Sequence, residues 1–157
     1  MTSHTWERPP FSVSTDPARL DLGVIHGFLR GSYWAKGISR EVMARSIEHS
    51  LCFGAYRERA QVGFARIISD LTTFAYLSDL FVLEPWRGHG LSKFMMECIK
   101  SHPQLQGLRR WMLATADAHG LYEQYGFQVI ARPEWMMEIV DLDIYVRGID
   151  SPRSRIT

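Results

Sequence analysis

Apolar residues are densest at residues 74–83, and this run, FAYLSDLFVL, is typical of a largely buried β-strand. The strand pattern breaks at residues 84–92, because Pro85 cannot donate to a sheet ladder and two glycines favour irregular backbone. Apolar positions then recur at helical spacing through residues 91–102, on a face made of Leu91, Phe94, Met95, Cys98 and Ile99. The pattern predicts a strand, a tight loop and a helix in succession.

Two more helices are predicted in the first third of the chain. Asp16 followed by Pro17 is typical of a helix start, and that helix would end at Gly31. Ser39 is the expected cap of the second helix. The apolar faces would carry Leu20, Val24, Ile25 and Phe28 in the first helix, and Val42 and Ile47, with Met43 beside them, in the second.

Alternating and β-branched runs predict the strands around the central one. Residues 11–14 would form an edge strand, and residues 51–56 and 61–68 would follow as two paired strands. These strands lead into residues 74–83 as an antiparallel meander. Residues 108–114 predict a strand parallel to the central one, because a helix separates the two along the chain.

The C-terminal part is expected to close the sheet. Residues 116–125 predict a short helix, and residues 127–131 and 136–140 predict two closing strands. Residues 141–157 are polar, with a short apolar stretch at 144–146 that could pack, and the tail from about residue 147 is expected to fray. The elements together predict an α/β fold with a mixed sheet.

Composition narrows the class of protein. A chain of 157 residues without linkers or repeats predicts a single domain over residues 1–157. Its net charge of +1 gives no support for a nucleic-acid or anionic-membrane partner. Cys52 and Cys98 stand in apolar runs, which favours buried free thiols over a disulfide or a metal site. No apolar run is long enough to span a membrane, and no signal peptide is evident, so a cytoplasmic location is expected.

The break after the central strand suggests a binding site for phosphate. The first turn of a helix carries amide groups without partners and a partial positive charge, and Gly88 and Gly90 would let a ligand lie close to the main chain. Arg87, Lys93 and the Ser92 hydroxyl could add to the binding. A plain glycine turn before a core helix is the alternative. The residue order fits neither a Walker loop nor a Rossmann fingerprint.

These residues resemble the GNAT superfamily of acetyl-CoA-dependent N-acetyltransferases. Its signature, Gln/Arg-x-x-Gly-x-Gly/Ala at a strand-to-helix junction, is matched by RGHGLS at residues 87–92, with Ser92 in the last position. Tyr122 stands four residues before the pair Gly126 and Phe127, a second feature of the family. The resemblance implies a mixed, mostly antiparallel sheet of six to seven strands flanked by about four helices. It also implies that the parallel pair of strands splays apart to admit acetyl-CoA.

The resemblance further implies roles for individual residues. Tyr122 would be the general acid that protonates the leaving thiolate, and a phenol of pKa about 10 suits that role. The alternative is a tyrosine that only lines the cofactor site, and Tyr125 is the competing candidate for the acid. The expected cofactor-binding residues are Leu80, Phe81, Val82, Arg87, Gly88, His89, Gly90, Leu91, Ser92, Lys93, Ala114, His119 and Tyr122.

Asp79 is the second candidate catalytic residue. A carboxylate within an apolar strand is costly unless it reaches solvent, a hydrogen-bond partner or a substrate. It could act as a base through water, anchor the acceptor ammonium, or be a structural carboxylate paired to Arg66. Aromatic groups with a carboxylate suit an ammonium ligand, and the candidate acceptor contacts are Tyr33, Trp34, Phe64, Arg66, Asp79 and Trp135, with core packing as the alternative for the aromatic ones.

The sequence therefore predicts an N-acetyltransferase that moves an acetyl group from acetyl-CoA to a primary amine by direct attack in a ternary complex. A small-molecule amine is the expected acceptor, with protein N-termini or lysines also open. No metal, nucleic acid or membrane partner is expected, and a homodimer is possible by resemblance. The alternative function is a non-catalytic acyl-CoA-binding sensor or scaffold, which would need the glycine loop but not Tyr122.

Overall fold

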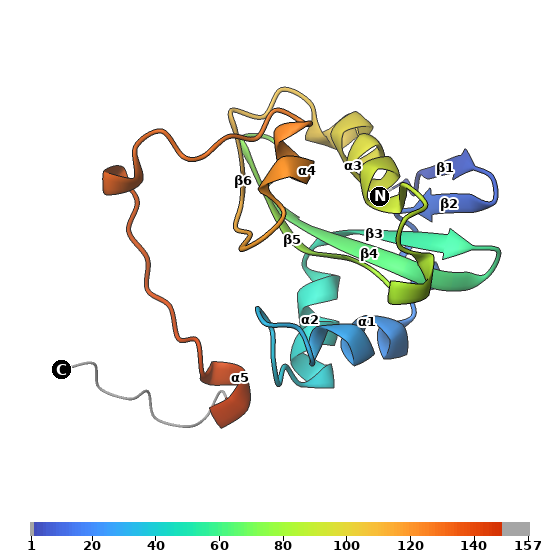
Figure 1. Ribbon diagram of the computed structural model, residues 1–157, viewed down its shortest axis with the longest axis horizontal. Coiled ribbons are helices and arrows are strands. Elements are labelled where there is room, and N and C mark those ends of the chain that lie inside the picture. The colour runs from blue at the N-terminus through green and yellow to red at the C-terminus, as the bar shows by residue number, and fades with distance from the viewer. Residues whose placement is uncertain (1, 149–157) are drawn as a thin grey trace.

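The computed structural model describes residues 2–148, and within them a mixed sheet of six strands forms the centre of the molecule (Figure 1). The strands lie side by side in the order in which they occur along the chain, and neighbours are antiparallel except for the parallel last pair. They are β1 (Thr5–Arg8), β2 (Phe11–Ser14), β3 (Leu51–Arg57), β4 (Ala60–Ser69), β5 (Phe74–Val82) and β6 (Arg110–Leu113).

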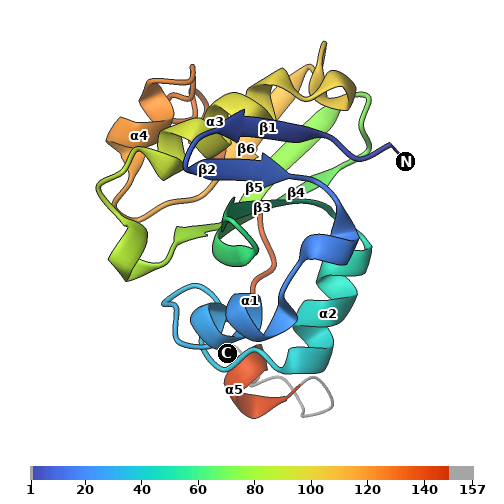
Figure 2. The same cartoon turned by 90° about the vertical axis from the view of Figure 1, so that its right-hand side faces the viewer.

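Helices cover both faces of the sheet (Figures 1 and 2). One face carries α3 and α4, and the opposite face carries α1 and α2, with α5 beside them. None of the described helices is long and apolar enough to cross a membrane. The helices are α1 (Leu22–Leu29), α2 (Arg40–Glu48), α3 (Leu91–Ser101), α4 (His119–Glu123) and α5 (Ile144–Arg147).

Two hydrophobic cores hold these layers together, because alternate residues of a strand point to opposite faces. Phe53 and Ala65 pack on the α3 side, whereas their neighbours Cys52 and Phe64 pack on the α1 and α2 side. This explains why the central strands are apolar on both faces. The predicted apolar face of α3 is buried in full, and Cys52 and Cys98 are buried free thiols as expected.

The first strand and the first helix differ from the predictions. Residues 11–14 form β2, but the edge strand is β1, which pairs with it. Asp16 caps only a short 3-10 helix, and the chain is extended again at Leu20. The α-helix begins later, where the Asp21 side chain accepts a hydrogen bond from the Val24 amide at 3.1 Å.

The predicted closing strands are wrong. Residues 127–131 and 136–140 form no strand, and their backbone has only a 3-10 helix at Pro133–Trp135 between them. An alternating apolar pattern becomes a strand only when another strand pairs with it, and no strand of residues 2–148 lies beside this segment. Of the apolar stretch at 144–146, Tyr145 in α5 joins the core beside α1, whereas the Val146 side chain is largely exposed. Most of the tail expected to fray lies outside the described residues.

The parallel strands β5 and β6 separate after a short pairing. Their register runs only from Phe74 opposite Arg110 to Leu77 opposite Leu113. On the other side of β5, the register with β4 shifts at a bulge, where Asp79 has a φ of 58°. The bulge turns this half of β5 away from β6. The splayed pair that the family resemblance implied is therefore present.

Candidate active site

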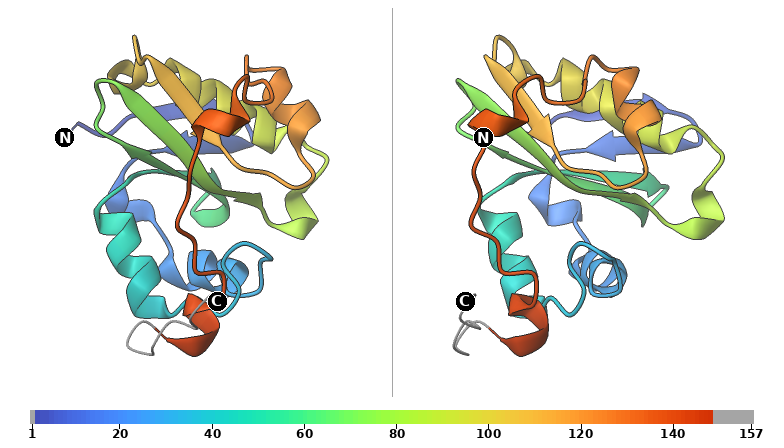
Figure 3. Two further views of the ribbon diagram at one scale, coloured as in Figure 1. Left: turned by 90° about the vertical axis from the view of Figure 1, so that its left-hand side faces the viewer. Right: turned by 60° about the vertical axis from the view of Figure 1, so that its left-hand side comes forward.

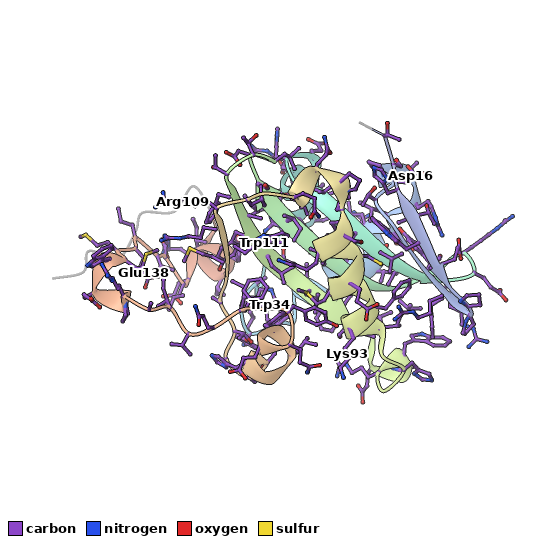
Figure 4. All side chains as sticks on the ribbon, turned by 90° about the horizontal axis from the view of Figure 1, so that it is seen from above. Asp16, Trp34, Lys93, Arg109, Trp111 and Glu138 are labelled. Atoms are coloured by element: carbon purple, nitrogen blue, oxygen red, sulfur yellow. The ribbon has the colours of Figure 1, made fainter. Side chains whose placement is uncertain are left out.

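A cleft of about 660 Å³ opens where β5 and β6 diverge. One wall is β5 from Tyr76 to Val82, which is paired with β6 only as far as Leu77, and the other is the chain from Leu113 to Ala118. Trp34 lies near the middle of the molecule in Figure 4, while Lys93 marks the start of α3 at one side. Of the residues predicted from the sequence, those lining the cleft are Tyr33, Trp34, Asp79, Leu80, Phe81, Val82, Arg87, Ser92, Ala114 and Tyr122.

The glycine loop, residues 87–92, lies at one end of the cleft. Its first amide, that of Arg87, donates to the Glu84 carbonyl at 3.2 Å. The amides of residues 88–93 have no acceptor among the hydrogen bonds of the described residues. Gly88 and Gly90 have φ values of 81° and 74°, and a Cβ at either position would meet no atom within 4 Å. The loop therefore presents free N–H groups to open space.

Side chains fix the shape of this loop. The Arg87 Nε donates to the Val82 carbonyl at 3.0 Å, which holds the guanidinium beside the end of β5. His89 Nδ1 lies 3.1 Å from two carbonyls, those of Trp86 and Arg87, so it must carry the proton and donate. The Leu91 side chain is buried in the core, so only its backbone can face a ligand. Free amides, a helix N-terminus and nearby cations together fit a phosphate group.

Tyr122 projects from α4 into the cleft. Burial, followed by the proximity of Tyr33 and Asp117, raises its pKa to about 12, so the phenol is protonated at neutral pH. No hydrogen bond among the described residues occupies its hydroxyl group. A turn at Gly126, with a φ of 91°, brings the Phe127 ring edge-on to the tyrosine at 6.0 Å. The glycine-phenylalanine pair thus positions Tyr122.

Asp79 is buried at the cleft wall and has two partners. One carboxylate oxygen accepts from the Trp34 indole at 2.8 Å, and the other accepts from the Arg66 Nε at 2.8 Å. Arg66 also reaches the hydroxyl groups of Ser50 and Ser78. The pairing with Arg66 that the sequence left open is present, and the same carboxylate still faces the cleft.

Several predicted contacts lie elsewhere. Phe64 is fully buried between the sheet and α1, and Arg66 lines a separate shallow pocket beside α2. His119 is exposed at the start of α4, and Trp135 is exposed on the C-terminal segment; neither lines the cleft. Lys93 is exposed at the rim. Gly88, His89, Gly90 and Leu91 adjoin the cleft through the loop that contains Arg87 and Ser92.

The sequence missed part of the cleft wall. Phe28 stacks on Phe81 with ring centroids 4.1 Å apart and lines the cleft, although it was expected only to face the core. The Tyr33 hydroxyl accepts a hydrogen bond from the Ala116 amide at 3.2 Å, which joins the loop after α1 to the chain after β6. Nothing in the local pattern around Ala116 indicates that contact, because the partners are 83 residues apart.

A family model for the acetyltransferase (GNAT) domain matches residues 48–129, which is more than half of the chain. The chain belongs to the GNAT family of acetyltransferases. The matched region runs from the end of α2 through the glycine loop and α4 to the residues just after Phe127. It therefore includes the two walls formed by β5 and by residues 113–118, but not the lining residues Phe28, Tyr33 and Trp34.

Relatives agree with this assignment. An inferred acetyltransferase of Gibberella zeae is 33% identical, over 74% of this chain and 78% of the relative. The crystal structure of an inferred GNAT acetyltransferase from Xanthomonas campestris is 50% identical with a TM-score of 0.86, covering 88% of this chain and 99% of that one. A GNAT acetyltransferase from Elizabethkingia anophelis, solved with acetyl-CoA bound, shares the fold at 12% identity and a TM-score of 0.61, covering 78% and 79% of the two chains.

Proposed function

We propose that this GNAT acetyltransferase transfers the acetyl group of acetyl-CoA to the primary amine of a small molecule by direct attack in a ternary complex. The observation that carries the proposal is the row of free amides at residues 88–93, at the end of a cleft between splayed strands. The Elizabethkingia relative, which was solved with acetyl-CoA, supports the choice of donor.

The glycine loop fits the diphosphate of acetyl-CoA. Each hydrogen bond from an amide to a charged oxygen contributes about 1.5–3 kcal/mol, so three or four would dominate binding. Within the part of the chain that the structure describes, the backbone of β5 beyond Leu77 has no strand partner on the β6 side, so it can accept the extended pantetheine arm. Bound in this way, acetyl-CoA supplies a thioester whose carbonyl carbon is open to attack.

Tyr122 is the proposed general acid. Its phenol keeps its proton at neutral pH because burial raises its pKa to about 12, and its hydroxyl group is free to donate. It would give this proton to the thiolate that leaves when the carbon–sulfur bond breaks. General acid catalysis of this kind is typically worth about 100- to 10,000-fold in rate.

Asp79 is proposed to anchor the acceptor as an ammonium, which loses one proton to solvent before the neutral amine attacks the thioester carbonyl carbon; at pH 7 this deprotonation costs about 4 kcal/mol for a pKa near 10. The Asp79 oxygens already accept from Trp34 and Arg66, but a carboxylate has about four lone-pair sites and can accept further bonds. Of the two functional roles that the sequence left open, a base through water or an ammonium anchor, anchoring requires no proton transfer to this carboxylate, which already has two partners. The aromatic rings of Phe28, Tyr33 and Trp34 beside it favour an amine with a flat or apolar body.

The test is a screen of primary amines with acetyl-CoA, in which release of the free CoA thiol is measured. Turnover that saturates with at least one small amine, together with mass-spectrometric detection of the acetylated amine, is the expected result. Saturable binding of acetyl-CoA without turnover on small amines, peptides or lysine-rich proteins would instead support a non-catalytic acyl-CoA sensor.

A further inference from the structure

The shallow pocket beside α2 has a volume of about 320 Å³ and lies between the end of that helix and strand β4. In both views of Figure 3, α2 is the turquoise helix on the face of the sheet opposite α3. No acidic residue is among the described residues that line the pocket, and none of them lines the cleft. The polar side chains of its lining are Arg45, Ser46, His49, Ser50 and Arg66.

Arg66 is the buried cation of this pocket, with 16% of its side chain exposed. Its Nε donates to Asp79 at 2.8 Å, and its two terminal nitrogens donate to the hydroxyl groups of Ser50 at 3.2 Å and Ser78 at 3.4 Å. A guanidinium carries five N–H groups. Two of them therefore have no acceptor within residues 2–148 and are left for a ligand in the pocket.

The end of α2 brings a second guanidinium and an imidazole to the same pocket. Arg45 and His49 are four residues apart, which places them on one side of the helix, and both are exposed. Neither forms an ion pair with any residue that the structure describes. Asp79 alone balances the charges of Arg45 and Arg66, so the two guanidinium groups repel each other across the pocket. An anion between them would remove that repulsion.

The C-terminal end of a helix ordinarily disfavours an anion, because its last carbonyl groups carry a partial negative charge. In α2 these carbonyl groups already accept hydrogen bonds from the protein. The Ser46 hydroxyl donates to the Met43 carbonyl at 2.7 Å, and the Ser50 hydroxyl donates to the Ser46 carbonyl at 2.7 Å. The Ser50 amide donates to the Ile47 carbonyl at 3.3 Å. The negative end of the helix is therefore offset before a ligand binds.

We propose that this pocket binds a phosphate group, held by the guanidinium groups of Arg45 and Arg66 and by the His49 ring. Phosphate oxygens accept several hydrogen bonds at once, and the planar fork of an arginine matches them in pairs. The ion pair of Arg66 with Asp79 joins the pocket to the cleft. The phosphate group can therefore belong to a separate ligand or to the acceptor amine. The second source rests on the proposed function, because it places the amine at Asp79.

The first test is a titration of the full chain with inorganic phosphate at constant ionic strength, followed through the NMR signals of the His49 ring. His49 reports on this pocket and not on the glycine loop, which also fits phosphate. We expect a saturable shift, with binding at least tenfold weaker in Arg45→Gln. The matched control Arg40→Gln removes the same charge from the start of α2, outside the pocket, and should bind like the wild type. Absence of saturation, or equal weakening in both variants, would overturn the proposal.

Matched phosphate esters then identify the source of the phosphate group. 2-Aminoethyl phosphate and ethyl phosphate differ only in the amine, as do their four-carbon analogues. Binding of an aminoalkyl phosphate at least tenfold tighter than that of its amine-free partner would assign the phosphate to the acceptor. Equal binding within each pair would make the pocket a site for a separate phosphate ligand. Failure of every ester to shift the His49 signals would contradict the site. These measurements record binding, so absence of turnover with any amine would contradict the proposed function alone.

Discussion

At the scale of single residues, the cleft depends on two buried polar groups in apolar surroundings. Asp79 has indole and guanidinium partners, whereas the Tyr122 hydroxyl has none among the described residues. The sequence indicated that Asp79 needs a partner, because its neighbours along the strand are apolar, and it named Arg66. It could not indicate Trp34 as the other partner, because the two residues are 45 positions apart and no spacing rule connects them.

Removing the Tyr122 hydroxyl should slow chemistry without weakening donor binding. We expect Tyr122→Phe to lower kcat about 100-fold or more while the KM for acetyl-CoA changes less than threefold. Tyr125→Phe is the control, because that hydroxyl donates to the Lys93 carbonyl outside the cleft and should leave kcat unchanged. Steady-state kinetics of thiol release measure kcat and the KM for acetyl-CoA in both variants. An unchanged kcat in Tyr122→Phe would show that Tyr122 is not the general acid.

Changing Asp79 separates its anchoring role from a purely structural one. Asp79→Asn keeps an acceptor for Trp34 but removes the negative charge, so the KM for the amine should rise about tenfold or more with little change for acetyl-CoA. Loss of the ion pair with Arg66 should also cost about 3 kcal/mol of stability. Urea unfolding measures that loss. Lower stability with an unchanged amine KM would leave Asp79 as a structural carboxylate only.

At the scale of elements, strand β5, the glycine loop and α3 act together as the donor site. Their order was predictable because apolar periodicity and glycine position are local features of the chain. The separation of β5 from β6 depends on a bulge, and the sequence alone did not show it; only the family resemblance suggested it. The two C-terminal strands were predicted wrongly because a strand forms only beside a pairing partner, and the local sequence does not show whether that partner is present.

A glycine substitution tests the loop. Gly90→Ala should weaken acetyl-CoA binding at least tenfold, because a side chain at a φ of 74° strains the loop and obstructs the amides. Gly107→Ala is a matched control: it imposes the same strain at a φ of 72°, also with open space around the Cβ, but away from the cleft. Isothermal titration should show reduced affinity only in the first variant. Equal losses in both variants would attribute the effect to general destabilisation.

At the scale of the whole molecule, two cores on opposite faces of one sheet position the cleft between them. The sequence predicted a largely buried central strand at residues 74–83, but the division of the apolar residues between two cores is seen only in the structure. Buried thiols in these cores should also govern stability at alkaline pH. Burial raises the pKa of Cys52 to about 12, whereas in the unfolded chain it is near 9.

The stabilising effect of this thiol is present below pH 9 and is lost as the pH rises toward 12, because only the unfolded thiol then ionises. The stability advantage of the wild type over Cys52→Ala should therefore shrink by up to about 2 kcal/mol between pH 9 and pH 10.5. Urea unfolding of both proteins at the two values measures it. An advantage that stays constant would show that the thiol is not shielded from water.

The most direct test of the account concerns the free amides of the glycine loop. Isothermal titration should compare S-acetyl-4′-phosphopantetheine with S-acetylpantetheine, which lacks only the phosphate. We expect at least tenfold tighter binding of the phosphorylated compound, since one hydrogen bond to a charged oxygen contributes about 1.5–3 kcal/mol. Affinities within a factor of two of each other would contradict phosphate recognition by this loop.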